Sequence, residues 1–125
     1  MEFSLDTGKG LYHIRAFEPG QIRVNDTLFT RSIVISPMEL IDHWPPQSIK
    51  DLQSEHLHCL LEFSPEPEVI LIGTGNHLIF PNPSLLAVLY QHQIGVEIMD
   101  TRAACRTYNV LMSEGRKVAA ALLIS

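Results

Sequence analysis

Residues 95–111 read GVEIMDTRAACRTYNVL, a pattern that predicts a short buried strand passing directly into a helix. Val96 and Ile98 are typical apolar strand residues. Asp100 or Thr101 then offers a side-chain oxygen to the free amides of a first helical turn. The Ala, Arg, Leu and Met residues that follow favour helix. The sequence therefore places a strand-to-helix junction at Asp100.

The predicted helix has one polar stripe. At about 100° per residue, Arg102, Arg106, Asn109 and Ser113 fall on the same narrow side. Most other positions are apolar: Ala103, Ala104, Tyr108, Val110, Leu111 and Met112. We expect a mostly buried helix that exposes one strip bearing two cations and an amide.

The rest of the C-terminal half repeats the alternation of strand and helix. Residues 69–72 form a continuous apolar run, which indicates a strand covered on both faces. Ser84 is expected to cap a helix through about residue 93, and residues 118–124 predict a last buried strand. The resulting βαβαβ pattern predicts parallel strands in one sheet, with residues 69–72 and 96–99 as parallel neighbours.

The N-terminal half predicts antiparallel β-structure. Residues 1–10 suggest a frayed entry, and residues 21–24 and 27–30 predict a hairpin about the turn at Asn25 and Asp26. Residues 31–36 predict a further strand, and residues 38–41 one helical turn. Ser48 or Asp51 would cap a helix to about residue 61, whose inner face is Leu52, Leu57, Leu60 and Leu61.

Composition limits the class of protein. The chain has 125 residues, 46% hydrophobic and 18% charged, which suits a single folded domain spanning residues 1–125. A formal net charge of −5 argues against general nucleic-acid or membrane-surface binding. The apolar runs are too short to span a bilayer, and the N-terminus shows neither a secretory signal nor a mitochondrial presequence. Cys59 and Cys105 have no CxxC spacing, so we expect a reducing cytoplasm.

Four segments carry a family resemblance: 72–75 (IGTG), 95–101 (GVEIMDT), 103–111 (AACRTYNVL) and 114–122 (EGRKVAAAL). They look like the Mth938-like family, a domain of unknown function whose members include the mitochondrial complex I assembly factor 3 group. The resemblance covers essentially the whole chain and is most specific over residues 69–122. It implies a three-layer α/β fold with a mixed central sheet and no established catalytic activity. The mitochondrial relatives act in respiratory complex assembly.

A crevice is expected where two strands end. If residues 69–72 and 96–99 are parallel neighbours, Gly73 to Gly75 and Asp100 to Arg102 line the edge at which open α/β sheets bind ligands. Arg102 and Arg106 would add positive charge beside a helix N-terminus. No full GxGxxG is present, so a tight backbone turn is favoured over nucleotide binding at these glycines.

Other chemical signals are weak. Cys105 would be reactive if the flanking arginines lowered its pKa, but a small packing residue is the favoured interpretation. Asp100 is more easily a helix cap than a general base. The six histidines form no HExxH or Cys/His cluster, so neither a metal nor a cofactor is expected.

Two functional hypotheses follow. The first is a non-enzymatic binding or assembly module that uses the stripe of Arg102, Arg106 and Asn109, together with the adjacent crevice, to bind another protein. The alternative is a binder of a small anion or nucleotide-like ligand, or an enzyme, that uses the crevice with Cys105 or Asp100 as its chemical group. The candidate binding residues are Gly73, Thr74, Gly75, Asp100, Thr101, Arg102, Cys105, Arg106 and Asn109.

Overall fold

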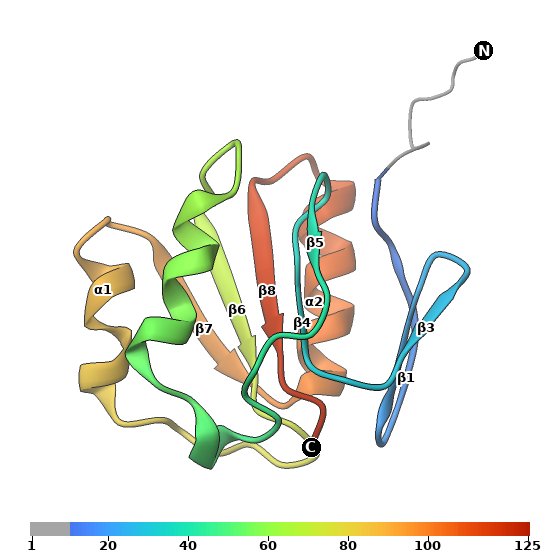
Figure 1. Cartoon of the computed structure of the whole chain (residues 1–125). Helices are drawn as coiled ribbons and strands as arrows, with labels where there is room; N and C mark the ends of the chain where they lie inside the picture. The colour runs from blue at the N-terminus through green and yellow to red at the C-terminus, as the bar shows by residue number, and fades with distance from the viewer. Residues whose placement is uncertain (1–10) are drawn as a thin grey trace.

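The computed structural model describes residues 11–125, and the expected frayed entry at residues 1–10 lies outside this range. The elements are β1 (Ile14–Glu18), β2 (Gln21–Val24), β3 (Thr27–Phe29), β4 (Ile33–Ile35), β5 (Leu40–Ile41), the 3-10 helices η1 (Ile49–Asp51) and η2 (Ser54–Glu62), β6 (Val69–Gly73), η3 (Pro83–Leu86), α1 (Ala87–Tyr90), β7 (Gly95–Met99), α2 (Thr101–Ser113) and β8 (Val118–Leu122). Figure 1 shows their arrangement.

The central sheet is mixed and has the strand order β5-β4-β8-β6-β7. Strand β6 is parallel to both β7 and β8, which confirms the predicted sheet of the C-terminal half. Strand β4 is antiparallel to β8 and β5. The predicted hairpin is also confirmed, because β1, β2 and β3 form a separate antiparallel sheet.

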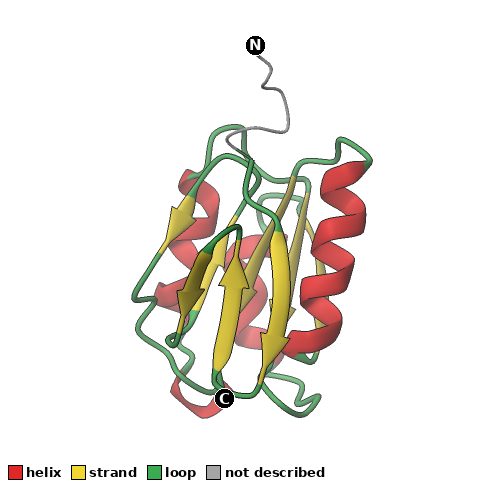
Figure 2. Ribbon diagram, turned by 90° about the vertical axis from the view of Figure 1, so that its right-hand side faces the viewer, coloured by secondary structure: helices red, strands yellow, loops and turns green. Residues whose placement is uncertain are grey.

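Helical segments cover both faces of the central sheet (Figures 1 and 2). A separate hydrophobic core lies on each face. On one face, α2 packs on β6 and β8 and also contacts β1 of the small sheet. This α2-side core includes Phe17, Leu71, Tyr108 and Leu122. The opposite face is covered by the 3-10 segments and α1, and its core includes Trp44, Leu60, Ile72 and Leu89. The result is the three-layer arrangement.

Two local predictions were wrong. Residues 38–41 form no helical turn, because Ser36 and Glu39 close a tight reversal through their backbones and the Ser36 hydroxyl. That reversal places Leu40–Ile41 beside β4 as strand β5. The helix expected over residues 48–61 is instead two 3-10 helices separated by Leu52 and Gln53, whose backbones are extended (φ −73° and ψ 128° at Leu52, φ −121° and ψ 158° at Gln53).

The capping predictions had mixed outcomes. Asp100 caps α2 as expected, with its carboxylate accepting a hydrogen bond from the amide of Ala103 at 2.8 Å. At the other junction the cap is Asn82 rather than Ser84, since the Asn82 side chain accepts from the amide of Ser84 at 3.0 Å. Pro83 then occupies the first helical position, where its missing amide costs nothing.

Candidate functional site

The carboxyl ends of β6 and β7 lie side by side and are joined by backbone hydrogen bonds. The amide of Thr74 donates to the carbonyl of Met99 at 2.8 Å, and the amide of Thr101 donates to the carbonyl of Gly75 at 2.9 Å. Beside this junction is a crevice of about 150 Å³. It is lined by Phe17, Pro19, Gly75, Asn76, Asp100 and Arg102. Three of the candidate residues therefore meet at one hollow.

Gly73 and Thr101 lie beneath the surface and hold α2 against the sheet. A Cβ atom on Gly73 would lie 2.8 Å from the Thr101 hydroxyl oxygen and 2.9 Å from its Cα. Thr101 is fully buried; its hydroxyl donates to the carbonyl of Leu123 at 2.7 Å and accepts from the amide of Gly75 at 2.8 Å. Both residues position the crevice without lining it.

The same hydrogen bonds bear on the small-anion alternative. A phosphate-binding turn needs free backbone amides at a helix N-terminus. Here the amides of Thr74, Gly75 and Thr101 are bonded within the chain, and Asp100 places a carboxylate on the first turn of α2. The geometry therefore gives the anion or nucleotide hypothesis no support.

The polar stripe of α2 pairs in part with β1, although both of its arginines are exposed as expected and only Asn109 is half-buried. Asn109 pairs with both backbone groups of Ile14: its Oδ1 accepts from the amide at 3.0 Å and its Nδ2 donates to the carbonyl at 2.7 Å. Arg102 donates to the carbonyl of Phe17 at 3.2 Å and lies 5.3 Å from the centre of that ring. Arg106 stays exposed.

The apolar side of α2 also differs from the prediction at one position. Val110, expected to be covered, is 54% exposed. Tyr108 is fully buried and its hydroxyl donates to the carbonyl of Tyr12 at 2.7 Å. Helix α2 thus bonds to the edge of β1 through Arg102 and Asn109, and to the segment just before β1 through Tyr108.

Cys105 is buried between α2 and the sheet. Burial raises the pKa of its thiol to about 12, although Arg102 and Arg106 act in the opposite direction. The thiol is therefore protonated near neutral pH, which is the state of a packing residue rather than of a nucleophile. Within residues 11–125, no three His, Cys, Asp or Glu side chains are placed to hold a metal ion.

An exposed apolar surface, which was not predicted from the sequence, follows β6. Leu78, Ile79 and Phe80 are 52%, 45% and 71% exposed at three consecutive positions. We call residues 78–80 the apolar loop. Its signal was present in the sequence as a short apolar run in a segment predicted only as a connection. Such a run between polar Asn76 and buried Pro81 is typical of a contact surface.

The apolar loop is held in place by buried Thr74, which is 2% exposed. The Thr74 hydroxyl donates to the carbonyl of His77 at 2.6 Å and accepts from the amide of Ile79 at 3.2 Å. Beside the loop is a groove of about 370 Å³ lined by Ser48, Ile49, Lys50, Thr74, Asn76, His77, Ile79 and Ser125. Asn76 lines both this groove and the crevice, so the two hollows adjoin.

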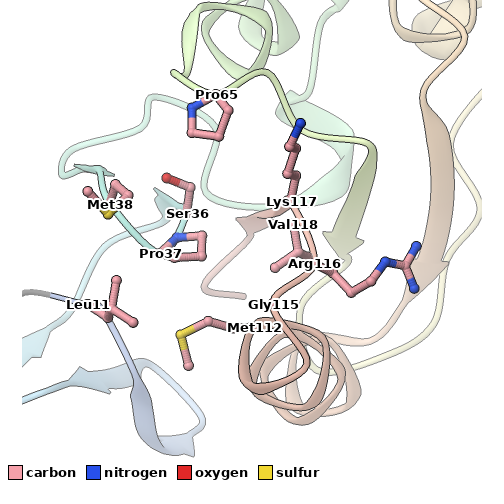
Figure 3. Close-up of a pocket in the computed structure, with 10 residues that line it drawn as sticks. All are labelled: Leu11, Ser36, Pro37, Met38, Pro65, Met112, Gly115, Arg116, Lys117 and Val118. Carbon is pink, nitrogen blue, oxygen red and sulfur yellow. The ribbon is translucent and has the colours of Figure 1, made fainter. Parts of the chain in front are cut away.

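A third hollow, of about 340 Å³, lies where β8 begins (Figure 3). It is lined by Leu11, Ser36, Pro37, Met38, Pro65, Met112, Gly115, Arg116, Lys117 and Val118. The Arg116 side chain points away from it and its Nε lies 3.2 Å from a carboxylate oxygen of Glu68. This hollow was not predicted from the sequence.

The three-layer fold is that of the Mth938-like domains. A solution structure from Bordetella pertussis, described as a Mth938-like domain, is 33% identical with a TM-score of 0.82, and the comparison covers 98% of this chain and 92% of that one. A crystal structure of a Bordetella parapertussis protein is 38% identical with a TM-score of 0.85, over 92% and 97% of the two chains. The chain belongs to the family described as "Protein of unknown function (DUF498/DUF598)", whose model matches residues 14–123.

Curated relatives carry a functional name. The NADH dehydrogenase [ubiquinone] 1 alpha subcomplex assembly factor 3 of Xenopus tropicalis is 36% identical over 94 residues, which are 72% of this chain and 51% of the relative. The chain thus spans about half the length of that relative. Over residues 11–125, no helix has both the length and the apolar character needed to cross a membrane.

Proposed function

We propose that the protein is a non-enzymatic module that binds another protein during the assembly of a larger complex. The observation that carries this proposal is the apolar loop, with three adjacent large apolar side chains exposed to solvent. Contiguous exposed apolar side chains on a small domain mark interaction sites. Large aromatic side chains such as Phe80 supply much of the binding energy at such sites.

The loop is prepared for binding by Thr74. Its buried hydroxyl donates one hydrogen bond to His77 and accepts another from Ile79, and these two bonds fix the backbone of the loop. A fixed loop loses less conformational entropy when it binds, so more of the contact energy appears as affinity. The crevice at Gly75, Asp100 and Arg102 would form the polar rim of the same surface.

The relatives named as assembly factors suggest the kind of complex. The proposed partner is a subunit of NADH dehydrogenase that has not yet joined the enzyme. The proposed location is the cytoplasm, a reducing compartment in which Cys59 and Cys105 remain free thiols. Exposed Arg106 would contribute a cation to an acidic partner surface.

The test is complementation in a bacterial strain that lacks its own member of the family. The strain carries the wild-type gene, the Phe80→Ser variant or the Val110→Ser variant, and assembled NADH dehydrogenase is measured on native gels. Val110 is the matched control, because it is an exposed apolar residue on α2, away from the loop. The free energy of unfolding of both variants should lie within about 0.5 kcal/mol of the wild-type value, as for ordinary surface changes.

We expect wild type and Val110→Ser to restore the assembled enzyme, and Phe80→Ser to restore less. Loss of one aromatic anchor commonly weakens binding by about 2 kcal/mol, or roughly thirtyfold. Normal NADH dehydrogenase in the strain without any family member would refute the respiratory role. Equal restoration by Phe80→Ser and wild type would refute the role of the apolar loop.

A further inference from the structure

Strand β7 forms one edge of the central sheet and, within residues 11–125, pairs only with β6 (Figure 1). The backbone amides and carbonyls of its odd-numbered residues point toward β6. The amide of Gly95 donates to the carbonyl of Glu68 at 3.1 Å, and the carbonyl of Met99 accepts from the amide of Thr74 at 2.8 Å. Backbone groups of successive strand residues point in opposite directions. The amides and carbonyls of Val96 and Ile98 therefore point outward.

The protein treats its other edges differently. Asn109 of α2 occupies the edge of β1 by pairing with both backbone groups of Ile14, as a neighbouring strand would. Strands β3 and β5 also lie at edges, but they have only three and two residues. Among the described strands, β7 is thus the longest open edge, with five residues. An open edge of this length is a template for a further strand.

The side chains of β7 define what such a strand would carry. The register pairs Val96 with Ile70 and Ile98 with Ile72, so both half-buried side chains lie on the face opposite α2. Glu97 is exposed and lies opposite Leu71 on the α2 face. An added strand would place apolar side chains beside Val96 and Ile98 and one side chain directly beside Glu97.

We propose that the edge of β7 binds an extended segment of another protein as an added strand, with a Lys or Arg opposite Glu97 and apolar residues on either side. Backbone hydrogen bonds supply affinity in this mode, and the alternating side chains supply specificity. This site is separate from the apolar loop and does not depend on the assembly role proposed above.

A second copy of this chain fits the edge poorly. Within β7, only Val96 and Ile98 present outward backbone groups. In an antiparallel pair of two copies that uses both residues of each copy, Val96 of one copy pairs with Ile98 of the other. The centre of that pairing places Glu97 opposite itself. Like charges directly opposite each other are unfavourable across a strand pair, so Glu97 disfavours self-pairing and favours a cationic segment.

The probe is the blocked pentapeptide acetyl-Thr-Val-Lys-Val-Thr-amide, whose palindromic order suits either strand direction. Binding to the full chain is followed by the NMR shifts of the Val96 and Ile98 amides at millimolar peptide. One control peptide carries an N-methyl group on the nitrogen of every residue, which removes the donors of either strand direction while keeping the side chains. A second control peptide has Glu in place of Lys.

We expect the Lys peptide to shift the Val96 and Ile98 amides and to bind roughly three- to tenfold more tightly than the Glu peptide. The Glu97→Lys variant should reverse that preference, and its exposed position keeps the fold intact. The N-methylated peptide should not bind. The proposal is overturned if neither amide shifts, if the N-methylated peptide binds equally, or if the wild-type chain dimerises through β7.

Discussion

The amide of Asn109 provides the sharpest test of how α2 is attached to the small sheet. Asn109→Ala removes an acceptor 3.0 Å from the Ile14 amide and a donor 2.7 Å from the Ile14 carbonyl. Ile14 is 5% exposed, so water does not easily replace the lost partner. The substitution should therefore leave two backbone groups poorly satisfied.

The magnitude follows from two opposing effects. Each lost hydrogen bond costs about 0.5–1.5 kcal/mol, or about 1–3 kcal/mol for the pair. Alanine is the better helix former by about 0.6 kcal/mol, which offsets part of that loss. We expect Asn109→Ala to lower the free energy of unfolding by about 1–2 kcal/mol, a sizeable share of a typical domain's 5–15 kcal/mol.

Two measurements check this value. Urea unfolding gives the change in free energy, and hydrogen exchange should show faster exchange of the Ile14 amide in the variant. Arg106→Gln is the matched control on the same stripe. Since Arg106 is exposed, the free energy of unfolding of this variant should remain within about 0.5 kcal/mol of the wild-type value. Unchanged urea stability together with an unchanged Ile14 exchange rate would refute the assigned role of Asn109.

Three further predictions concern the junction and the surface. Gly73→Ala should lower the free energy of unfolding by about 1–3 kcal/mol in thermal melts, because the new Cβ would overlap the backbone of Thr101; an unchanged melt would contradict the close approach. Native Cys105 should react with a thiol reagent at neutral pH far more slowly than in denatured protein, because burial raises its pKa to about 12, and rapid native labelling would contradict this. For Glu68, hydrogen bonds from the Lys117 amide and then from Arg116 lower the carboxyl pKa below its usual 4.5. The ionised Glu68 carboxylate therefore stabilises the fold above pH 4.5, and this stabilisation is lost as the pH falls through the folded-state pKa. The melting temperatures of wild type and Glu68→Gln should accordingly differ at neutral pH and converge in acid.

Local signals in the sequence were sufficient to predict the β7–α2 junction. Val96 and Ile98 suit a strand, and Asp100 caps the helix that follows, as the structure shows. The parallel pairing of β6 with β7 followed from the alternation of strands and helices. These features are specified by patterns along the chain, so they can be predicted from a single sequence.

Features that depend on distant neighbours were not predictable in this way. The helical period placed Asn109 on a polar stripe, but it could not show that the Asn109 side chain pairs with Ile14, 95 residues earlier. For the same reason the contact of Arg102 with Phe17 was not predicted, although Arg102 is exposed as expected. The apolar loop was missed because burial of a short apolar run depends on the whole fold.

The position of Trp44 makes one layer of the molecule optically distinct. It is the only tryptophan, is 2% exposed, and its indole nitrogen donates to the carbonyl of His56 at 3.0 Å. It belongs to the core on the face opposite α2. Its fluorescence therefore reports on that layer, while circular dichroism averages over the whole backbone. Coincident transitions by the two signals would mean that both layers unfold as one cooperative unit.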